Sequence, residues 1–414
     1  MENLIKTNIQ DAQALEQLYK KDKTGFVNAF KSIYEDIQSM PIAQAWNARI
    51  KYKQDEMSWG KKNEIKLIIF IAILSGFIAK LPALIGMEYD IYLSRNISFI
   101  ILPMLTVYFI WKQNGALKTY LIPALIFIAS AIYINWLPFN EKSDTILLAT
   151  LHLPVFLWMI LGYAFVNGDV RDNLKRIEFL KFNGNFIVMT GLIFIAGALF
   201  SAITIALFEL LKIDISKFYF EQIAIWALPG IPMISSFLVQ NNPQLVSKIS
   251  PIIAKLFTPL VSMTLLVFLC TLVYTGKNVY NDRNFLLLFN VLLVIVMAII
   301  LFSVTTIQLS KNSRIQIILL ITLSLLTIVA NAVALSAIGF RLIEFGITPN
   351  RLAVLGTNLL MFVHLFFVAA TLLKNLKGKT TILGIEKEIA LFIPYYAVWA
   401  AFITFIMPFL FKLI

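Results

Sequence analysis

Charged residues are scarce in this chain. Of its 414 residues, 14% are Asp, Glu, Lys or Arg and 59% are hydrophobic, whereas a soluble domain has about 25% charged and about 45–50% apolar residues. The apolar residues come in blocks of about twenty, the length that a helix needs to cross ~30 Å of hydrocarbon. The composition therefore excludes an ordinary soluble protein and predicts an all-α, polytopic bundle of transmembrane helices.

Cysteine occurs once, as Cys270, and histidine occurs twice. A single cysteine forms neither an intramolecular disulfide nor a cysteine-based metal cluster, and because Cys270 lies in an apolar block we expect a small core residue. We predict no metal site and no cofactor. The start of the chain lacks the apolar stretch and small-residue cleavage site of a signal peptide, so we expect nothing to be removed there.

Three motifs of common enzymes and ATPases are also missing. The sequence contains no G-x-x-x-x-G-K-[ST] phosphate loop, no H-E-x-x-H and no G-x-S-x-G. Their absence disfavours ATP-driven transport by this chain alone, a standard zinc protease and a serine hydrolase. No Asp or Glu falls near the middle of an apolar block, which disfavours coupling through a buried carboxylate.

About eleven apolar blocks predict membrane spans, within a range of ten to twelve. The expected limits are 67–86, 97–112, 119–137, 145–166, 186–211, 220–240, 252–274, 285–307, 315–338, 352–373 and 389–411. With the N-terminus inside, twenty lysines and arginines flank the inner ends of these spans and nine the outer ends. The positive-inside rule then predicts a cytoplasmic N-terminus and a periplasmic or extracellular C-terminus.

The net charge of +12 has the same explanation. Lysine and arginine held on the cytoplasmic side face anionic lipid, so we expect membrane lipids as partners and no nucleic acid.

Residues 1–63 differ in composition from the transmembrane domain, 64–414. Their pattern predicts an amphipathic helix, flanked by two more, with one apolar face formed by Phe26, Phe30, Ile33, Tyr34 and Ile37. One interpretation is a small cytoplasmic helical cap. The other is an element that docks on a protein partner or on the membrane surface.

Few polar side chains interrupt the spans, and these are the candidate substrate-binding residues. Lys80 either snorkels to the interface or reaches a cavity. His152 and His364 are either neutral imidazoles that join helices or groups that handle protons, bind a ligand or catalyse. Asn290, Asn331 and Asn358 are more typical of contacts between helices.

The sixth block contains two prolines around a glycine, at Pro229, Gly230 and Pro232. Proline removes a backbone donor and kinks a helix, and broken helices line the central sites of transporters. We therefore predict a cavity at Pro229 and Gly230, reached by Lys80 or by one histidine.

The connection after the ninth block has its own pattern. Arg341 and Glu344 are three residues apart and can pair on one helical face. Gly346 is expected to end that helix, and Thr348 to cap the next, which begins at a proline. The alternatives are a satisfied loop or a grip by Arg341, Glu344 and Arg351 on a phosphate or carboxylate group.

This loop resembles the aromatic-Gly-Leu/Ile-Thr-x-x-Arg signature of the bacterial membrane family named domain of unknown function 4153. The matching residues are Phe345, Gly346, Ile347, Thr348 and Arg351. The resemblance implies a multispanning protein of the bacterial inner membrane and brings no established activity.

Three functional hypotheses follow. The first is a transporter-like handler of a small or lipidic substrate. The second is a non-catalytic subunit or scaffold of a membrane complex, with residues 1–63 contacting the partner. The third is a membrane-embedded transferase with His152 or His364 as its base.

Overall fold

The structure is a computed structural model, and every element in it is helical. It describes residues 1–51, 60–138, 140, 142–210, 212–243, 245, 249–276, 280, 283–305 and 313–413. The described residues form two compact units, one within residues 1–58 and one within 59–414. Each unit has a hydrophobic core of its own.

The N-terminal unit consists of four short helices. These are α1 (Glu2–Thr7), α2 (Ala12–Lys21), α3 (Lys23–Ile37) and α4 (Pro41–Lys51). Asp11 caps α2 and Asp22 caps α3 by accepting backbone N–H bonds, which satisfies donors that a helix start leaves free. Along α3, the predicted apolar face packs inside this unit, where Phe26 and Phe30 are fully buried and Phe26 contacts Trp46. That face therefore stabilises the unit itself and is not left open.

The second unit confirms the predicted all-α polytopic bundle. Ten of its described helices are long and apolar enough to cross a membrane, and a further apolar helical segment covers Phe289–Thr305. The main helices are α5 (Lys62–Ile85), α6 (Tyr89–Lys112), α7 (Leu117–Trp136), α8 (Asp144–Phe165), α9 (Asn173–Leu210), α11 (Ile225–Asn241), α13 (Ile249–Thr275), α14 (Arg283–Thr305), α15 (Ser313–Phe345), α16 (Pro349–Leu376) and α17 (Ile382–Ala401).

Shorter pieces complete the chain path. A helical turn α10 (Ser216–Phe218) and a π-helical segment η1 (Tyr219–Ala224) lead into α11. After α17, a second π-helical segment, η3 (Phe402–Ile406), and α18 (Met407–Leu410) extend the last helix. The protein is therefore a multi-pass membrane protein whose outer side chains contact lipid.

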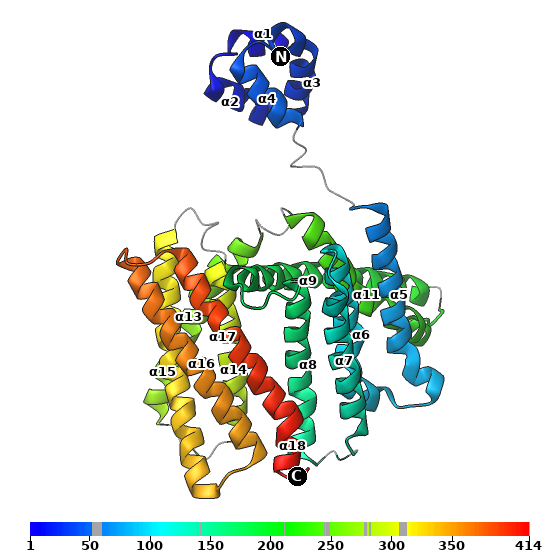
Figure 1. The fold of residues 1–414 in the computed structure, drawn as a ribbon, viewed down its shortest axis with the longest axis vertical. Helices are drawn as coiled ribbons and strands as arrows, with labels where there is room; N and C mark the ends of the chain where they lie inside the picture. The colour runs from blue at the N-terminus through cyan, green and yellow to red at the C-terminus, as the bar shows by residue number, and fades with distance from the viewer. Residues whose placement is uncertain are drawn as a thin grey trace. The chain divides into compact units, whose positions relative to one another are not determined.

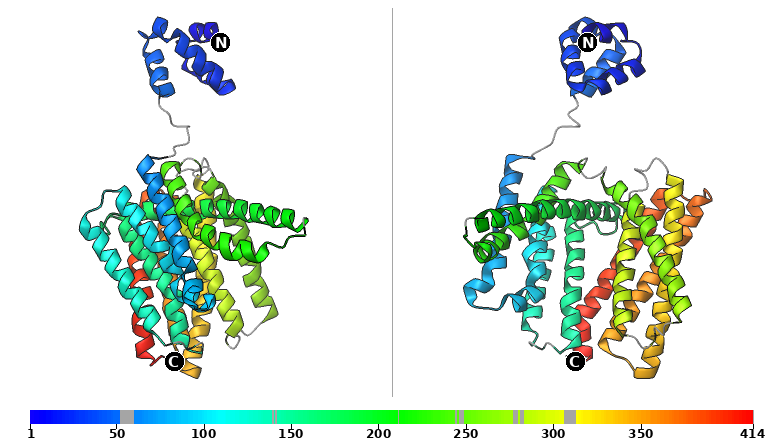
Figure 2. Two further views of the ribbon diagram at one scale, coloured as in Figure 1. Left: turned by 90° about the vertical axis from the view of Figure 1, so that its right-hand side faces the viewer. Right: turned by 180° about the vertical axis from the view of Figure 1, so that it is seen from behind.

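The helices of the second unit gather in two groups joined by α9 (Figure 1). One group contains α5 to α8 and α11, and the other contains α13 to α16. Helix α17 packs on both α16 and α8, and its extension α18 lies against α8. In Figures 1 and 2, α9 runs at a steep angle to α8, α15 and α16. Its 38 residues give a length of about 57 Å, which exceeds the ~30 Å of hydrocarbon, so α9 is too long to cross the hydrocarbon along the membrane normal.

The connections alternate between the two ends of this unit. The α6–α7 and α16–α17 connections lie at the end where α5 begins, called the upper end here, and the α15–α16 connection and the C-terminus lie at the lower end (Figure 1).

Candidate functional site

Buried and half-buried polar side chains gather on α14, α15, α16 and α17. We call this set the polar seam, and it consists of Asn290, Ser324, Thr327, Asn331, Asn358, His364 and Tyr396. On α15, Ser324, Thr327 and Asn331 are spaced as i, i+3 and i+7 and are all fully buried, so they share one helix face.

Three asparagines form the lower part of the seam, one from each of three helices. The side-chain Nδ2 of Asn331 donates to the backbone oxygen of Asn358 at 3.0 Å. In turn, Nδ2 of Asn358 donates to Oδ1 of Asn290 at 2.7 Å. These bonds join α14, α15 and α16, as predicted for asparagines that connect helices.

His364 and Tyr396 form the upper part of the seam. The imidazole of His364 is 1% exposed, and its Nδ1 lies 3.2 Å from the hydroxyl oxygen of Tyr396. The ring stacks on Phe392 with a centroid distance of 4.3 Å and an interplanar angle of 4°. The α16–α17 contact therefore holds the imidazole in one orientation. Its other nitrogen, Nε2, does not take part in the contact with Tyr396.

Several seam atoms have no hydrogen-bond partner in the part of the chain that the structure describes. They are Ser324 Oγ, Asn331 Oδ1, Asn358 Oδ1 and His364 Nε2. A buried polar group without a partner costs roughly 1–3 kcal/mol, and in a membrane interior water does not compensate freely. These four atoms lie on the neighbouring helices α15 and α16, and each is still able to form a hydrogen bond.

Of the five predicted substrate-binding residues, His364 alone belongs to the seam. Lys80, in α5, donates to the backbone oxygen of Glu221 and so joins α5 to η1. His152 contacts the carbonyl oxygen of Leu148 in its own helix at 2.9 Å. Neither contact places a polar group beside His364.

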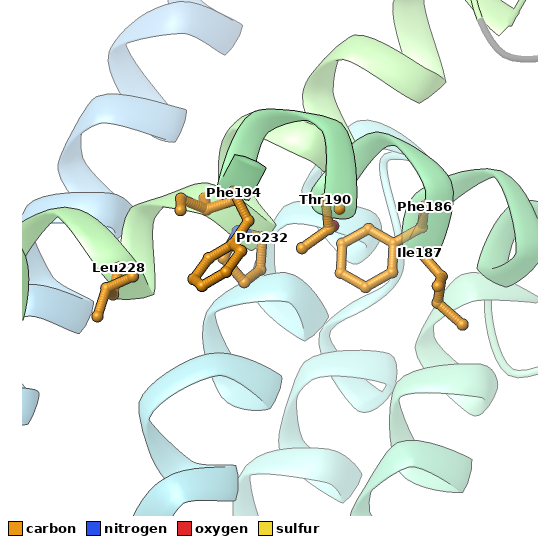
Figure 3. A pocket seen from close by; sticks show the side chains of 8 residues that line it. Phe186, Ile187, Thr190, Phe194, Leu228 and Pro232 are labelled. Carbon is orange, nitrogen blue, oxygen red and sulfur yellow. The ribbon is translucent and has the colours of Figure 1, made fainter. Parts of the chain in front are cut away.

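The prolines of the sixth block do not break α11, which continues from Ile225 to Asn241. Pro229 and Gly230 are buried, and a Cβ at Gly230 would lie 3.6 Å from Ala72 Cβ, so this side of α11 packs on α5. An open apolar groove of about 370 Å³ lies on another side of α11, against α9 (Figure 3). It is lined by Phe186, Ile187, Thr190, Gly191, Phe194, Leu228, Ile231 and Pro232.

This groove differs from the predicted cavity, because neither Lys80 nor a histidine lines it. Thr190 supplies its one side-chain polar group. The groove is therefore lined almost entirely by apolar side chains.

The α15–α16 connection has the predicted helix ends. Gly346 follows the last residue of α15 with φ +75°, Pro349 is the first residue of α16, and the Thr348 side chain accepts from the backbone N–H of Arg351. The Arg351 guanidinium donates to the backbone oxygens of Phe345 at 2.8 Å and Gly346 at 2.7 Å. Arg351 thus binds carbonyl groups that the end of α15 leaves free.

The predicted pair between Arg341 and Glu344 does not form: no ion pair joins them among the described residues. Arg341 instead has one buried guanidinium nitrogen, Nη1, without a partner in the described part of the chain. Glu344 is exposed. The contacts therefore favour a satisfied loop built on Arg351 over a three-residue grip on an anion.

Arg351→Ala is expected to lower the free energy of unfolding by about 1–2 kcal/mol, because two charge-assisted hydrogen bonds at a partly exposed site are lost. The thermal unfolding midpoint in detergent measures this effect. Arg171→Ala, at an exposed position of the α8–α9 connection, is the control and should change little. If Arg351→Ala left the midpoint unchanged but abolished binding of an anion, the result would instead favour an anion-binding role for Arg351.

Two buried ion pairs were missed at the sequence level. Glu64 is 5% exposed, and its Oε1 accepts from Lys112 Nζ at 2.7 Å, Tyr108 OH at 2.8 Å and Asn241 Nδ2 at 2.9 Å. These contacts join α5, α6 and α11.

The second pair joins α9 to α17. Lys181 Nζ lies 2.8 Å from Glu386, whose side chain is 2% exposed. Glu386 lies four residues after the start of α17, so it is near a span end and not in the middle of a span, and only its ion pair with Lys181 was not predicted. Cys270 also differs from expectation, since it is exposed on α13 and not in the core.

No three His, Cys, Asp or Glu side chains come close enough to hold a metal ion among the described residues. Comparison with protein-family models, curated proteins and solved structures gave no match to this chain. The resemblance of the α15–α16 loop to the family of unknown function therefore stays a prediction.

Proposed function

We propose that this chain is a bacterial inner-membrane protein that handles a small polar substrate in the manner of a transporter, with the polar seam as its binding site. The observation that carries the proposal is the set of buried, unpartnered seam atoms on Ser324, Asn331, Asn358 and His364. Polar groups inside membrane helices are costly and commonly mark substrate pathways. The bacterial assignment rests on the loop resemblance alone.

The chemistry of the seam suits binding better than catalysis. Its side chains are amides, hydroxyls and one imidazole, and no seam residue is a carboxylate or a lysine. His364 is stacked on Phe392 and contacts Tyr396 through Nδ1. The imidazole can therefore contact a substrate through a hydrogen bond at Nε2. A transferase reaction would also need an electrophile-activating group, which the described seam residues do not supply.

A ligand screen tests the proposal. The purified protein is heated in detergent with small polar metabolites, and we expect at least one to raise the unfolding midpoint. His364→Phe should remove that rise, because it keeps the stacking on Phe392 and loses Nε2. His152→Phe is the control, since that imidazole hydrogen-bonds to the Leu148 carbonyl oxygen of its own helix and does not belong to the seam. If no compound distinguishes the two variants, the seam is not the binding site.

The predicted orientation gives a separate test. In a Cys270→Ala background, Lys118→Cys places a thiol at the upper end and Lys142→Cys places one at the lower end; both positions are exposed. A membrane-impermeant maleimide applied to intact cells should label Lys142→Cys and not Lys118→Cys. The reverse labelling would place the C-terminus in the cytoplasm.

A second candidate function is a subunit of a membrane complex, which the hairpin of α9 and α11 favours. Exposed apolar side chains cover α9, including Ile195, Leu199 and Phe200, each more than 60% exposed, while Lys212 and Lys217 at its tip are exposed as well. A protein partner would cover both kinds of side chain. Recovery of a second protein at fixed stoichiometry from the native membrane would support this candidate over the first.

A further inference from the structure

The lower part of the polar seam has the chemistry of a cation site. We infer that Asn290, Asn331 and Asn358 bind a monovalent cation of the Na⁺ class between α14, α15 and α16. This inference rests on the proposed function of the same seam and names an ion that binds there.

The hydrogen-bond inventory gives the first step. An asparagine amide offers two N–H donors and one accepting oxygen. Asn331 and Asn358 are 0% and 1% exposed, and each uses a donor on a neighbouring helix. Both Oδ1 atoms remain without a donor in the described part of the chain. The atoms of these two amides that lack a partner are therefore hydrogen-bond acceptors.

The amide orientations support the same conclusion. Turning the Asn331 amide over would set its oxygen against the backbone oxygen of Asn358, and two acceptors repel, so the assignment at Asn331 is fixed. Turning Asn358 and Asn290 over together would put the Nδ2 of Asn358 where its Oδ1 now lies. The orientation in the structure is therefore the one that leaves the Oδ1 atoms of Asn331 and Asn358 both without a donor.

Uncharged oxygens without donors are the ligands that hard cations take. None of the three residues is acidic, so the cluster offers no charge to neutralise a divalent ion, whose burial would cost far more than that of a monovalent ion. Thr327 lies on the same face of α15, one turn before Asn331, and its hydroxyl donates to the carbonyl oxygen of Leu323, so the hydroxyl oxygen keeps its accepting capacity.

The position of the cluster is inside the membrane helices. Asn358 lies nine residues after the start of α16, or ~14 Å along its axis, and Asn331 lies eighteen residues after the start of α15, or ~27 Å along its axis. An ion at that depth gives up its water, and the free amide oxygens of α15 and α16, with the already bonded oxygen of Asn290 on α14 beside them, replace part of its shell.

Binding of ²²Na⁺ to the purified protein tests the inference directly, with choline chloride at equal ionic strength as the reference. The wild type should bind Na⁺ and unfold at a higher temperature in Na⁺ than in choline. Asn331→Leu should weaken Na⁺ binding at least ~10-fold and remove the difference in unfolding temperature. Asn183→Leu is the matched control and should retain both, because both ends of the Asn183 amide are already bonded.

A second variant covers the case in which Asn331→Leu does not fold. Asn358→Asp keeps the oxygen and adds a negative charge, and the Asn290 amide can turn over to donate to it. This variant should bind Na⁺ more tightly than the wild type and lose that gain when acid neutralises the carboxylate. Wild type that binds no Na⁺ and unfolds identically in both salts would overturn the inference and leave the asparagines as helix contacts. Substrate binding is also measured in choline without Na⁺. Substrate that still binds there would show that the proposed function holds although the Na⁺ inference has failed.

Discussion

Lys112→Met is expected to lower the free energy of unfolding by about 3 kcal/mol. The substitution removes the ammonium that lies 2.7 Å from Glu64 and leaves a carboxylate of which 6% of the side chain is exposed. Breaking one partner of a buried ion pair costs about 3–5 kcal/mol, and the lower limit applies because Lys112 keeps a quarter of its side chain exposed. Unfolding in a denaturing detergent measures the loss.

Two further variants separate the ion pair from general effects of removing a lysine. Lys118→Met, at an exposed position of the same end, should change stability by less than ~0.5 kcal/mol. Adding Glu64→Gln to Lys112→Met should restore much of the loss, since the amide still accepts from Tyr108 and no charge is left unpaired. If Lys112→Met and Lys118→Met behave alike, Glu64 does not depend on Lys112.

Gly356→Leu is expected to prevent α16 and α17 from packing as they do in the wild type. A Cβ at Gly356 would lie 1.9 Å from Cζ2 of Trp399, and Trp399 is also held by a hydrogen bond from its Nε1 to Thr357 Oγ1 at 3.0 Å. Overpacking typically costs about 1–3 kcal/mol, and a clash with a rigid indole should reach the upper end of this range. The yield of folded protein and its unfolding midpoint are the measurements.

Gly339 supplies the matched control for this prediction. It also lies in a membrane helix, α15, but a Cβ there would meet no atom within 4 Å. Gly339→Ala should therefore be neutral or stabilising by up to ~1 kcal/mol, because alanine is the better helix former. Gly356→Leu as stable as the wild type would show that the α16–α17 contact is looser than described.

The sequence predicted the parts of the fold that depend on local patterns. Block length and hydropathy identify the membrane helices, the 3.6-residue period of Phe26 and Phe30 identifies the buried face of α3, and the types of Gly346 and Thr348 identify a helix end and a cap. Each of these features depends on residues within one or two turns of each other.

Contacts between distant helices could not be predicted in the same way. Glu64 and Lys112 are 48 residues apart in the sequence. Each lies at the end of an apolar block, where a charged residue is ordinary and does not indicate a partner. Hydropathy gives the length of α9 but not its tilt, and it does not show that Lys181 meets Glu386. For the site, the two histidines looked equivalent, and only the packing of α16 on α17 separates His364 from His152.

Native mass spectrometry in nanodiscs formed from the protein's own membrane tests most directly whether the polar seam binds a substrate. Wild type and Asn358→Leu would be compared for every small molecule that remains bound. The proposal predicts a small polar compound retained by the wild type and lost from Asn358→Leu, while lipids are retained by both. Identical sets of bound compounds, or a second protein as the only specific companion of the wild type, would contradict it.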